Sequence, residues 1–245
     1  MINGAITAIT KLINKKTDKV TAVIVAAGKS SRMEGVDKIF APLGGEPLIV
    51  SSIKAFENCS RVTEIVVVLS EENCEQGKLM CELHGFTKVT AIIPGGKERS
   101  ESSYIGVQAA DKKSKYIIIH DGARPFVTEK MITDSLDAAV KRGAAIVGVP
   151  VTSTIKRVKD GIINETVDRI DLYDIQTPQT FRTDVIKAAL KSAIDKKLPI
   201  TDDSMAVEAI GLSPKIVLGS RDNIKITVRE DLVIANAIFN SRSDG

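Results

Sequence analysis

Small and cationic residues come together in one short stretch near the start of the chain. Residues 26–33 read Ala-Ala-Gly-Lys-Ser-Ser-Arg-Met, and Lys38 follows shortly after them. Small residues let a backbone approach a ligand closely, and backbone N–H groups can hold phosphate oxygens. Arg32 and Lys38 add positive charge that suits an anionic ligand. The stretch matches neither a Walker A loop nor the Gly-x-Gly-x-x-Gly fingerprint, and a turn with solvated cations is the alternative interpretation.

A second charged group lies further along the chain, where residues 120–125 read His-Asp-Gly-Ala-Arg-Pro. An aspartate at the carboxyl end of a strand, such as Asp121, can hold Mg²⁺ that bridges nucleotide phosphates. Arg124 can bind a substrate phosphate through two parallel hydrogen bonds. An Asp–Arg surface pair across a proline turn is the alternative interpretation of the same residues.

Weaker signals are spread over the rest of the chain. Gly95 and Gly96 precede a predicted helix, and such a turn can face a base or a ribose, although Gly-Gly before a helix is often only a turn. Residues 201–203 read Thr-Asp-Asp and are also suited to capping a helix. Lys225 lies in an alternating segment and is also compatible with a solvent-exposed position.

Histidine is scarce, because His84 and His120 are the only two in the sequence. No Ser–His or Cys–His nucleophile system is therefore apparent. A phosphate monoester is already ionised near neutral pH, so its transfer onto a nucleoside triphosphate needs positioning and cations rather than a general base. The supply of cations and the lack of an evident base agree with that chemistry.

An alternation of apolar strands and helices is predicted to position these residues. Strands are expected at residues 21–26, 64–69, 89–93, 116–120 and 144–149, and helices at 47–58, 72–84, 99–111 and 128–142. Nearly continuous apolar strands are typical of a parallel sheet that is buried on both faces. The pattern predicts a doubly wound α/β sheet with helices on both faces.

Residues 150–181 interrupt this alternation. Two short strands, 155–158 and 162–167, flank an Asp-Gly turn signal and predict a projecting β-arm. A lone two-stranded arm is marginally stable in water, so we expect it to contact a second subunit; a hairpin folded onto its own domain is the alternative. The remaining elements are expected as helices at 184–195, 202–210 and 230–240 and strands at 215–218 and 223–228.

Bulk properties narrow the class of protein. The chain has 245 residues, 43% of them hydrophobic and 27% charged, with a net charge of +3. The sequence contains no block of five or more like charges, so a nucleic-acid-binding tail is not indicated. No apolar run approaches the ~20 residues needed to span a membrane. The three cysteines match no zinc or redox spacing, which points to reduced thiols and a cytoplasmic location. Residues 1–19 are expected to be an N-terminal extension before a single domain at 20–245.

Eight stretches of the sequence, in order and with the right spacing, resemble the 2-C-methyl-D-erythritol 4-phosphate cytidylyltransferase family of non-mevalonate isoprenoid synthesis. The similarity covers about residues 20–240. The stretches are AAGKSSRM, DKIFAPLGGEPLI, PGGKERSESSYIG, HDGARPF, VPVTSTIK, VDRIDLYDIQTPQTF, TDDSMAVEAIG and DNIKITVREDL.

The resemblance implies a homodimer of Rossmann-like subunits, joined through the β-arm, that uses Mg²⁺ to transfer CMP from CTP to methylerythritol phosphate. It implies that Arg32 and Lys38 stabilise the transition state at the α-phosphate and that Asp121 lies beside the metal and the substrate. The residues implied to contact the nucleotide are Ala26, Ala27, Gly28, Gly96 and Ser102. Those implied to hold the sugar phosphate are Arg124, Thr201 and Lys225, while Thr154 and Arg169 would reach the partner's site.

Three other functions stay open at this point. Ribitol-5-phosphate cytidylyltransferases share the glycine loop and the Asp-x-x-Arg-Pro stretch, although Arg169 with its neighbours and the 201–204 stretch favour the methylerythritol substrate. A catalytically silent nucleotide-binding protein would need fewer cations at the α-phosphate. A Rossmann oxidoreductase is disfavoured because the dinucleotide fingerprint is absent.

Overall fold

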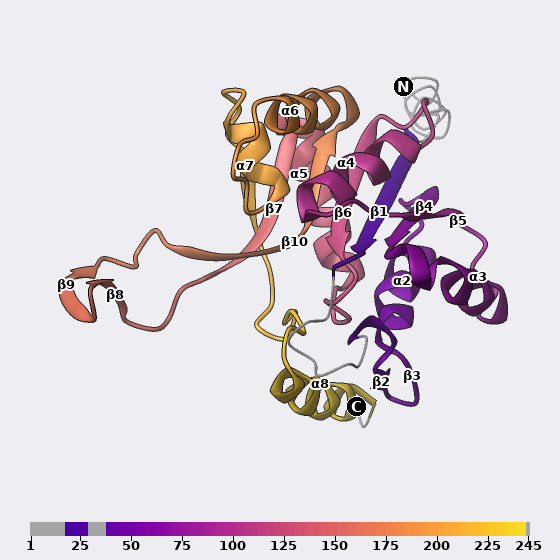
Figure 1. Cartoon of the computed structure of the whole chain (residues 1–245), viewed down its shortest axis with the longest axis horizontal. Helices are drawn as coiled ribbons and strands as arrows, with labels where there is room; N and C mark the ends of the chain where they lie inside the picture. The colour runs from indigo at the N-terminus through magenta and orange to yellow at the C-terminus, as the bar shows by residue number, and fades with distance from the viewer. Residues whose placement is uncertain (1–17, 29–37, 244–245) are drawn as a thin grey trace, which may run out of the picture.

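A seven-stranded sheet forms the centre of the protein, with strand order β11-β7-β10-β6-β1-β4-β5. The structure is a computed structural model that describes residues 18–28 and 38–243 (Figure 1). The strands are β1 (Val20–Ala26), β4 (Glu64–Leu69), β5 (Val89–Pro94), β6 (Tyr116–Asp121), β7 (Ala144–Pro150), β10 (Tyr173–Arg182) and β11 (Lys215–Leu218). Only β10 runs antiparallel to its neighbours, β6 and β7. The expected mostly parallel α/β sheet is confirmed.

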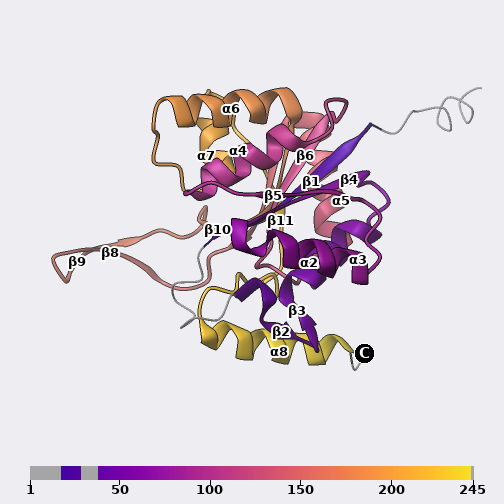
Figure 2. The same ribbon diagram turned by 45° about the vertical axis from the view of Figure 1, so that its right-hand side comes forward.

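Helices cover both faces of this sheet because alternate strand residues are apolar on both sides. One face of β1, represented by Ala22 and Ile24, packs with α2 (Leu48–Asn58), α3 (Cys74–Leu83) and α5 (Glu129–Arg142). The other face, represented by Val23 and Val25, packs with α4 (Arg99–Ala109), α6 (Thr183–Asp195) and α7 (Asp203–Glu208). Figure 2 shows α4, α6 and α7 together on one side and α2 and α3 on the other.

The carboxyl-terminal helix α8 (Arg229–Ser243) covers a smaller apolar cluster beside the main sheet. The cluster joins α8 to β2 (Pro42–Leu43) and to the start of α2, through Leu43, Leu48, Phe126, Ile226 and Ala235. The short strand β3 (Glu46–Pro47) pairs with β2. Figure 1 shows α8 beside β2 and β3, away from the main sheet.

The predicted β-arm is present and extends away from the sheet (Figure 1). Its strands are β8 (Ile155–Lys159) and β9 (Ile162–Val167), paired antiparallel. Asp160 and Gly161 connect them with positive φ values of 52° and 79°, which is the backbone of a type I′ hairpin turn. The Asp-Gly signal was therefore correct in type and position.

Two segments differ from the sequence expectation. Residues 173–182, at the end of the stretch expected to interrupt the alternation, form β10 and complete the sheet between β6 and β7. Residues 223–228, expected as a strand, are a loop. Their N–H groups bind elsewhere: that of Ile226 donates to the Ala123 carbonyl, and those of Thr227 and Val228 donate to the Asp231 carboxylate. Over the part of the chain that the structure describes, no helix has the length and apolar character to cross a membrane.

Candidate active site

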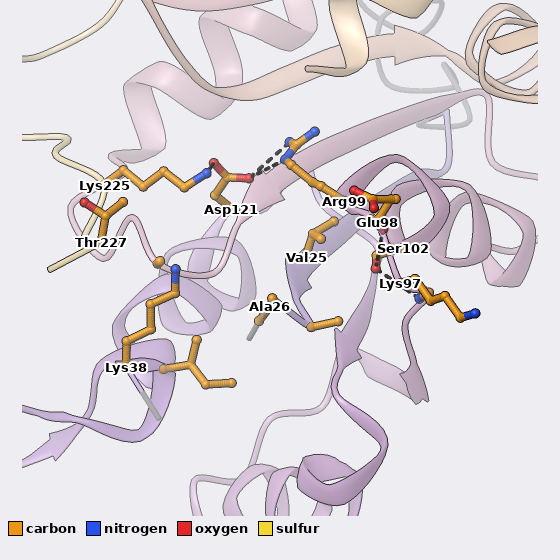
Figure 3. Close-up of a pocket in the computed structure, with 15 residues that line it drawn as sticks. Val25, Ala26, Lys38, Lys97, Glu98, Arg99, Ser102, Asp121, Lys225 and Thr227 are labelled. Atoms are coloured by element: carbon orange, nitrogen blue, oxygen red, sulfur yellow. Dashed lines mark hydrogen bonds and ion pairs between the residues drawn. The ribbon is translucent and has the colours of Figure 1, made fainter. Parts of the chain in front are cut away.

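Two adjacent pockets lie at the carboxyl ends of the parallel strands, where sheets of this class bind ligands. The β1 pocket is lined by residues that follow β1, the start of α4 and the loop after β11 (Figure 3). The β10 pocket is lined by β10, the start of α7 and the loop after β6. Arg99, Asp121 and Lys225 line both pockets. A ligand in one pocket therefore meets the same charged side chains as a ligand in the other.

Asp121 is the centre of the shared wall. One carboxylate oxygen lies 3.0 Å from an Arg99 guanidinium nitrogen, and the other lies 2.8 Å from Lys225 Nζ. The Nε atom of Arg124 lies 3.8 Å from the second oxygen. Figure 3 shows Arg99 and Lys225 approaching the carboxylate from opposite sides. Both oxygens of Asp121 are thus engaged by cations.

These cations determine the charge of Asp121. Burial alone would raise the pKa of the carboxyl group, but the attraction of Arg99, Lys225 and Arg124 outweighs it and holds the pKa well below its usual range. Asp121 is consequently a carboxylate at neutral pH. Because the Asp121 side chain is only 9% exposed, solvent screens its attraction to these cations only weakly.

The loop after β11 positions Lys225 through polar contacts with β10. Asn223 donates to the Thr177 carbonyl over 2.9 Å and to the Gln176 side chain over 3.2 Å. The Asn223 carbonyl accepts a 2.7 Å hydrogen bond from Arg124. Because Asn223 is fully buried, each of these bonds replaces one that water would otherwise make. The loop is fixed in this way, and Lys225 is directed at Asp121.

His120 is an uncharged, buried residue that connects the loop after β6 to β10. Its Nε2 lies 3.1 Å from the Arg124 carbonyl, which can only accept a hydrogen bond, so Nε2 carries the proton. Its Nδ1 is then an acceptor for the Thr177 hydroxyl at 2.9 Å, and that hydroxyl accepts from the Asp121 N–H. Burial lowers the pKa of His120 to about 4. Both ring nitrogens are occupied, and the ring acts as a structural link rather than a base.

The loop before α4 forms the opposite wall of the β1 pocket. A Cβ atom on Gly95 would lie 2.4 Å from Ala27 Cβ and 2.6 Å from Ser102 Oγ, so glycine allows the two loops to approach each other. The Gly96 N–H donates to Ser102 Oγ over 3.1 Å. Glu98 and Glu101 form a capping box that starts the helix. The Gly-Gly turn expected to face a base or a ribose therefore lines the pocket that also contains Ala26 and Gly28.

The structure places most of the predicted site residues on the two pockets. Ala26, Ala27, Gly28, Lys38, Gly96 and Ser102 line the β1 pocket, Arg124 and Thr201 line the β10 pocket, and Asp121 and Lys225 line both. Arg32 lies outside the described residues. Thr154 and Arg169 are exposed near the arm and line neither of these pockets of their own subunit.

Sequence reasoning missed two residues, Arg99 and Asp203, which pair at 2.8 Å beside Asp121. A usable signal was present: Arg99 stands at the first position of a predicted helix, where a cation opposes the helix dipole. Asp203 gave no such signal, because its neighbour Asp202 looked equally able to cap the helix.

The described residues do not offer a ready metal centre. Within 18–28 and 38–243, no three or more His, Cys, Asp or Glu side chains are grouped to hold a metal ion. Asp121 would have to release Arg99 or Lys225 before it could bind one. Asp202 is occupied by the N–H of Met205 and by Gln179. The arrangement does not fit Asp121 as a direct metal ligand.

Comparison with known proteins agrees with this geometry. Residues 20–241 match the family model described as IspD: 2-C-methyl-D-erythritol 4-phosphate cytidylyltransferase. The chain belongs to this cytidylyltransferase family. A relative of that name from Alkaliphilus metalliredigens is 41% identical over 232 residues, covering 93% of this chain and 95% of the relative. One from Caldanaerobacter subterraneus is 43% identical, covering 88% and 96%.

Solved structures of the cytidylyltransferase family share the fold. The 4-diphosphocytidyl-2C-methyl-D-erythritol synthase of Anaerococcus prevotii is similar with a TM-score of 0.82 and 28% identity, covering 91% of this chain and 97% of that one. The 2-C-methyl-D-erythritol 4-phosphate cytidylyltransferase of Thermus thermophilus is similar with a TM-score of 0.75 and 29% identity, covering 89% and 98%. The residues that the family model matches, 20–241, include the sheet, the residues of both pockets and the arm.

Proposed function

We propose that the two pockets form one active site, in which CTP occupies the β1 pocket and 2-C-methyl-D-erythritol 4-phosphate occupies the β10 pocket. The protein transfers CMP from CTP to the sugar phosphate, giving 4-diphosphocytidyl-2-C-methyl-D-erythritol and pyrophosphate for isoprenoid precursor synthesis. The observation that carries this proposal is the shared wall of Arg99, Asp121 and Lys225. It brings the phosphates of both substrates to one cluster of charges.

The reaction needs no general base. An oxygen of the sugar phosphate attacks the α-phosphorus of CTP, the new P–O bond forms, and the bond to the β-phosphate breaks to release pyrophosphate. The attacking oxygen is already ionised, so the protein supplies alignment and positive charge. Lys38, which lines the β1 pocket, and Arg32 are assigned to the charge that develops at the α-phosphate. His120 takes no part, because both of its nitrogens are engaged.

Mg²⁺ is part of this proposal through the nucleotide. Mg²⁺ keeps several waters and is commonly bound by substrate phosphates together with one or two carboxylates. Because Asp121 is paired with Arg99 and Lys225, we assign the metal to the triphosphate rather than to this carboxylate. Its chemistry there is charge neutralisation on the phosphate oxygens.

We also propose that the protein works as a cytoplasmic homodimer joined through the β-arm. Exposed apolar side chains on the arm, including Val158, Ile162 and Ile163, support this assembly because a lone hairpin is marginally stable. Thr154 and Arg169 would then face the β10 pocket of the partner subunit. Free thiols at Cys59, Cys74 and Cys81 suit a reducing compartment.

The test is pyrophosphate release from CTP and Mg²⁺ with three acceptor conditions: methylerythritol 4-phosphate, ribitol 5-phosphate and no acceptor. Release with methylerythritol phosphate alone is the expected result. Release with ribitol phosphate alone would keep the chemistry and overturn the assigned acceptor. Binding of CTP without release under any condition would overturn the assignment of this chain as a working transferase.

A further inference from the structure

Arg99 occupies a position that local preferences disfavour. It is the first residue of α4, where the helix dipole repels a cation. Its side chain is only 27% exposed and contacts two carboxylates, those of Asp121 and Asp203. Burial lowers the pKa of Arg99, but the attraction of Asp203 and Asp121 outweighs this and raises it overall. The guanidinium is thus fixed by opposite charges and not by its own helix.

Asp203 is the anchor of this arrangement. It is fully buried at the start of α7, and its carboxylate lies 2.8 Å from Arg99. Asp202 performs the capping of α7, because its carboxylate accepts from the Met205 N–H. Neither carboxylate oxygen of Asp203 accepts a hydrogen bond from the described residues, so the ion pair with Arg99 is what neutralises this buried group. A buried carboxylate in this state is costly unless its cation is present.

The order of contacts runs from α7 to the reacting groups. Asp203 binds Arg99, Arg99 binds one oxygen of Asp121, and the other oxygen of Asp121 binds Lys225. Figure 3 shows Arg99 crossing from the start of α4 to Asp121 while Lys225 reaches it from the far side. With Arg99 in this place, one oxygen of Asp121 faces the guanidinium and the other faces the Lys225 ammonium.

We propose that Arg99 is a positioning residue: anchored by Asp203, its guanidinium orients Asp121 and thereby directs Lys225 into the space shared by the two pockets. The inference rests on the proposed function, because its consequence is measured on cytidylyl transfer. Arginine is required, since a planar fork can bind two carboxylates at once whereas a lysine ammonium is a single point charge.

The experiment compares Arg99→Lys and Asp203→Asn with the wild-type enzyme, using CTP and methylerythritol phosphate. We expect each variant to lower kcat by about 10- to 100-fold, because a misplacement near 1 Å costs about that much. The KM for CTP should change by less than about threefold, because the β1 pocket keeps its other walls. The kcat of the double variant should be no lower than that of the less active single variant, since both residues act through one contact.

The matched control is an Arg–Asp pair outside the site. Arg61 and Asp137 pair at 3.1 Å with both side chains about half exposed. Arg61→Lys and Asp137→Asn should leave kcat within about twofold of wild type, as expected for surface ion pairs. If Arg99→Lys also stays within twofold, or if the losses of Arg99→Lys and Asp203→Asn multiply, the positioning role is wrong. If the wild-type enzyme itself releases no pyrophosphate, the proposed function fails instead.

A variant that removes both charges of the pair separates positioning from simple loss of structure. Arg99→Met/Asp203→Asn leaves neither residue with an unpaired buried charge, so its melting temperature should stay near that of the wild type. Its kcat should remain lowered by about 10- to 100-fold, because no guanidinium then holds the Asp121 carboxylate from the side of α4. A kcat within twofold of the wild type would overturn the proposal, and so would a loss of kcat that occurs only together with a lowered melting temperature.

Discussion

Asp121 remains charged inside the protein because cations from three separate segments surround it. Arg99 and Arg124 also carry a cost of burial, and Arg99 additionally opposes the dipole of its helix. Such local conflicts persist at functional sites when the surrounding structure compensates for them. In this protein Asp203 and Asp121 supply the compensation, and the result is a cationic surface that suits two phosphorylated substrates.

Lys38 provides the direct test at this scale. Lys38→Ala should reduce kcat by about 100- to 1,000-fold, because it removes a cation from the position where charge develops. The fold should be retained, since the side chain lies on the pocket surface. Steady-state pyrophosphate release measures the effect. Lys191→Ala, an exposed lysine that pairs with Asp195 on α6, is the control, and an equal loss in both variants would refute the assigned role.

His120 predicts how stability depends on pH. Its pKa is about 4 in the folded protein, against about 6.5 in the unfolded chain. Between these values the unfolded chain takes up a proton that the folded protein does not, so stability should fall as pH decreases from 6.5 to 4. The expected loss between pH 7 and 4.5 is about 2–3 kcal/mol.

Urea unfolding at pH 7 and 4.5 measures this loss. His120→Gln should remove most of the pH dependence in that window, even if the variant is less stable at pH 7. His84→Gln is the control, because His84 is the other histidine and lies near the surface beside Glu46. Equal pH dependence in wild type and His120→Gln would contradict the prediction.

At the scale of elements, the strands that consist of continuous apolar runs could be predicted from the sequence. The five parallel strands of the first part of the chain were found because residues such as Ile65 and Ile118 leave no polar face. β10 was missed because Gln176, Thr177 and Gln179 are buried polar residues around a proline, which reads as a loop. The Gln176 side chain donates to the Ser220 carbonyl after β11, the Gln179 side chain donates to Asp202 at the start of α7, and the Thr177 hydroxyl contacts His120. Such long-range partners cannot be read from a local pattern.

In the site, too, residues with a recognisable local motif were predicted and residues with only long-range partners were not. The pocket-lining motifs at Ala26–Gly28 and around Asp121 were identified because small, cationic and acidic residues together are typical of a site for a charged ligand. The Arg99–Asp203 pair was missed because it joins the starts of two helices that only the tertiary structure brings together. Residues 223–228 were wrongly expected as a strand, since their alternation arises from Ile224 and Ile226 facing α8.

The placement of α4 on the sheet depends on Gly106. A Cβ atom there would lie 2.3 Å from Val23 Cγ1 and 2.8 Å from Val68 Cγ2, so the helix would have to move away from β1 and β4. Gly106→Ala should destabilise the protein by about 1–3 kcal/mol, although alanine alone would favour a helix by about 1 kcal/mol. Because Ser102 and Arg99 are on the same helix, kcat should fall as well.

Thermal unfolding and pyrophosphate release test this together. Gln108→Ala is the control, because Gln108 is an exposed residue of the same helix and gains propensity without a new contact. If Gly106→Ala is as stable as Gln108→Ala, the claim that Gly106 allows α4 to pack closely on the sheet is wrong.

At the scale of the whole molecule, the two pockets of one chain are lined without the arm residues that were expected to reach a partner's site. Within the described residues, the walls come from the β1 loop, the start of α4 and the loop after β11. Thr154 and Arg169, which flank the arm strands, are exposed and line neither pocket, and the arm exposes Ile162 and Ile163. Figure 1 shows the arm extending away from the sheet. An arm that exchanges with a second copy related by twofold symmetry would supply these polar residues to the partner's site.

Mixing two inactive variants tests this exchange. On the proposed exchange, Lys38→Ala removes a cation from its own site and Arg169→Ala would remove one from the partner's site. In a heterodimer of the two, one site has both defects and the other has neither. After subunit exchange half of the dimers are heterodimers with one intact site of two, so about a quarter of wild-type activity should return. If Arg169 serves its own site instead, both sites of the heterodimer are damaged and no activity returns. Native mass spectrometry of tagged chains would verify that heterodimers formed, so that absence of recovery would refute the exchanged arm.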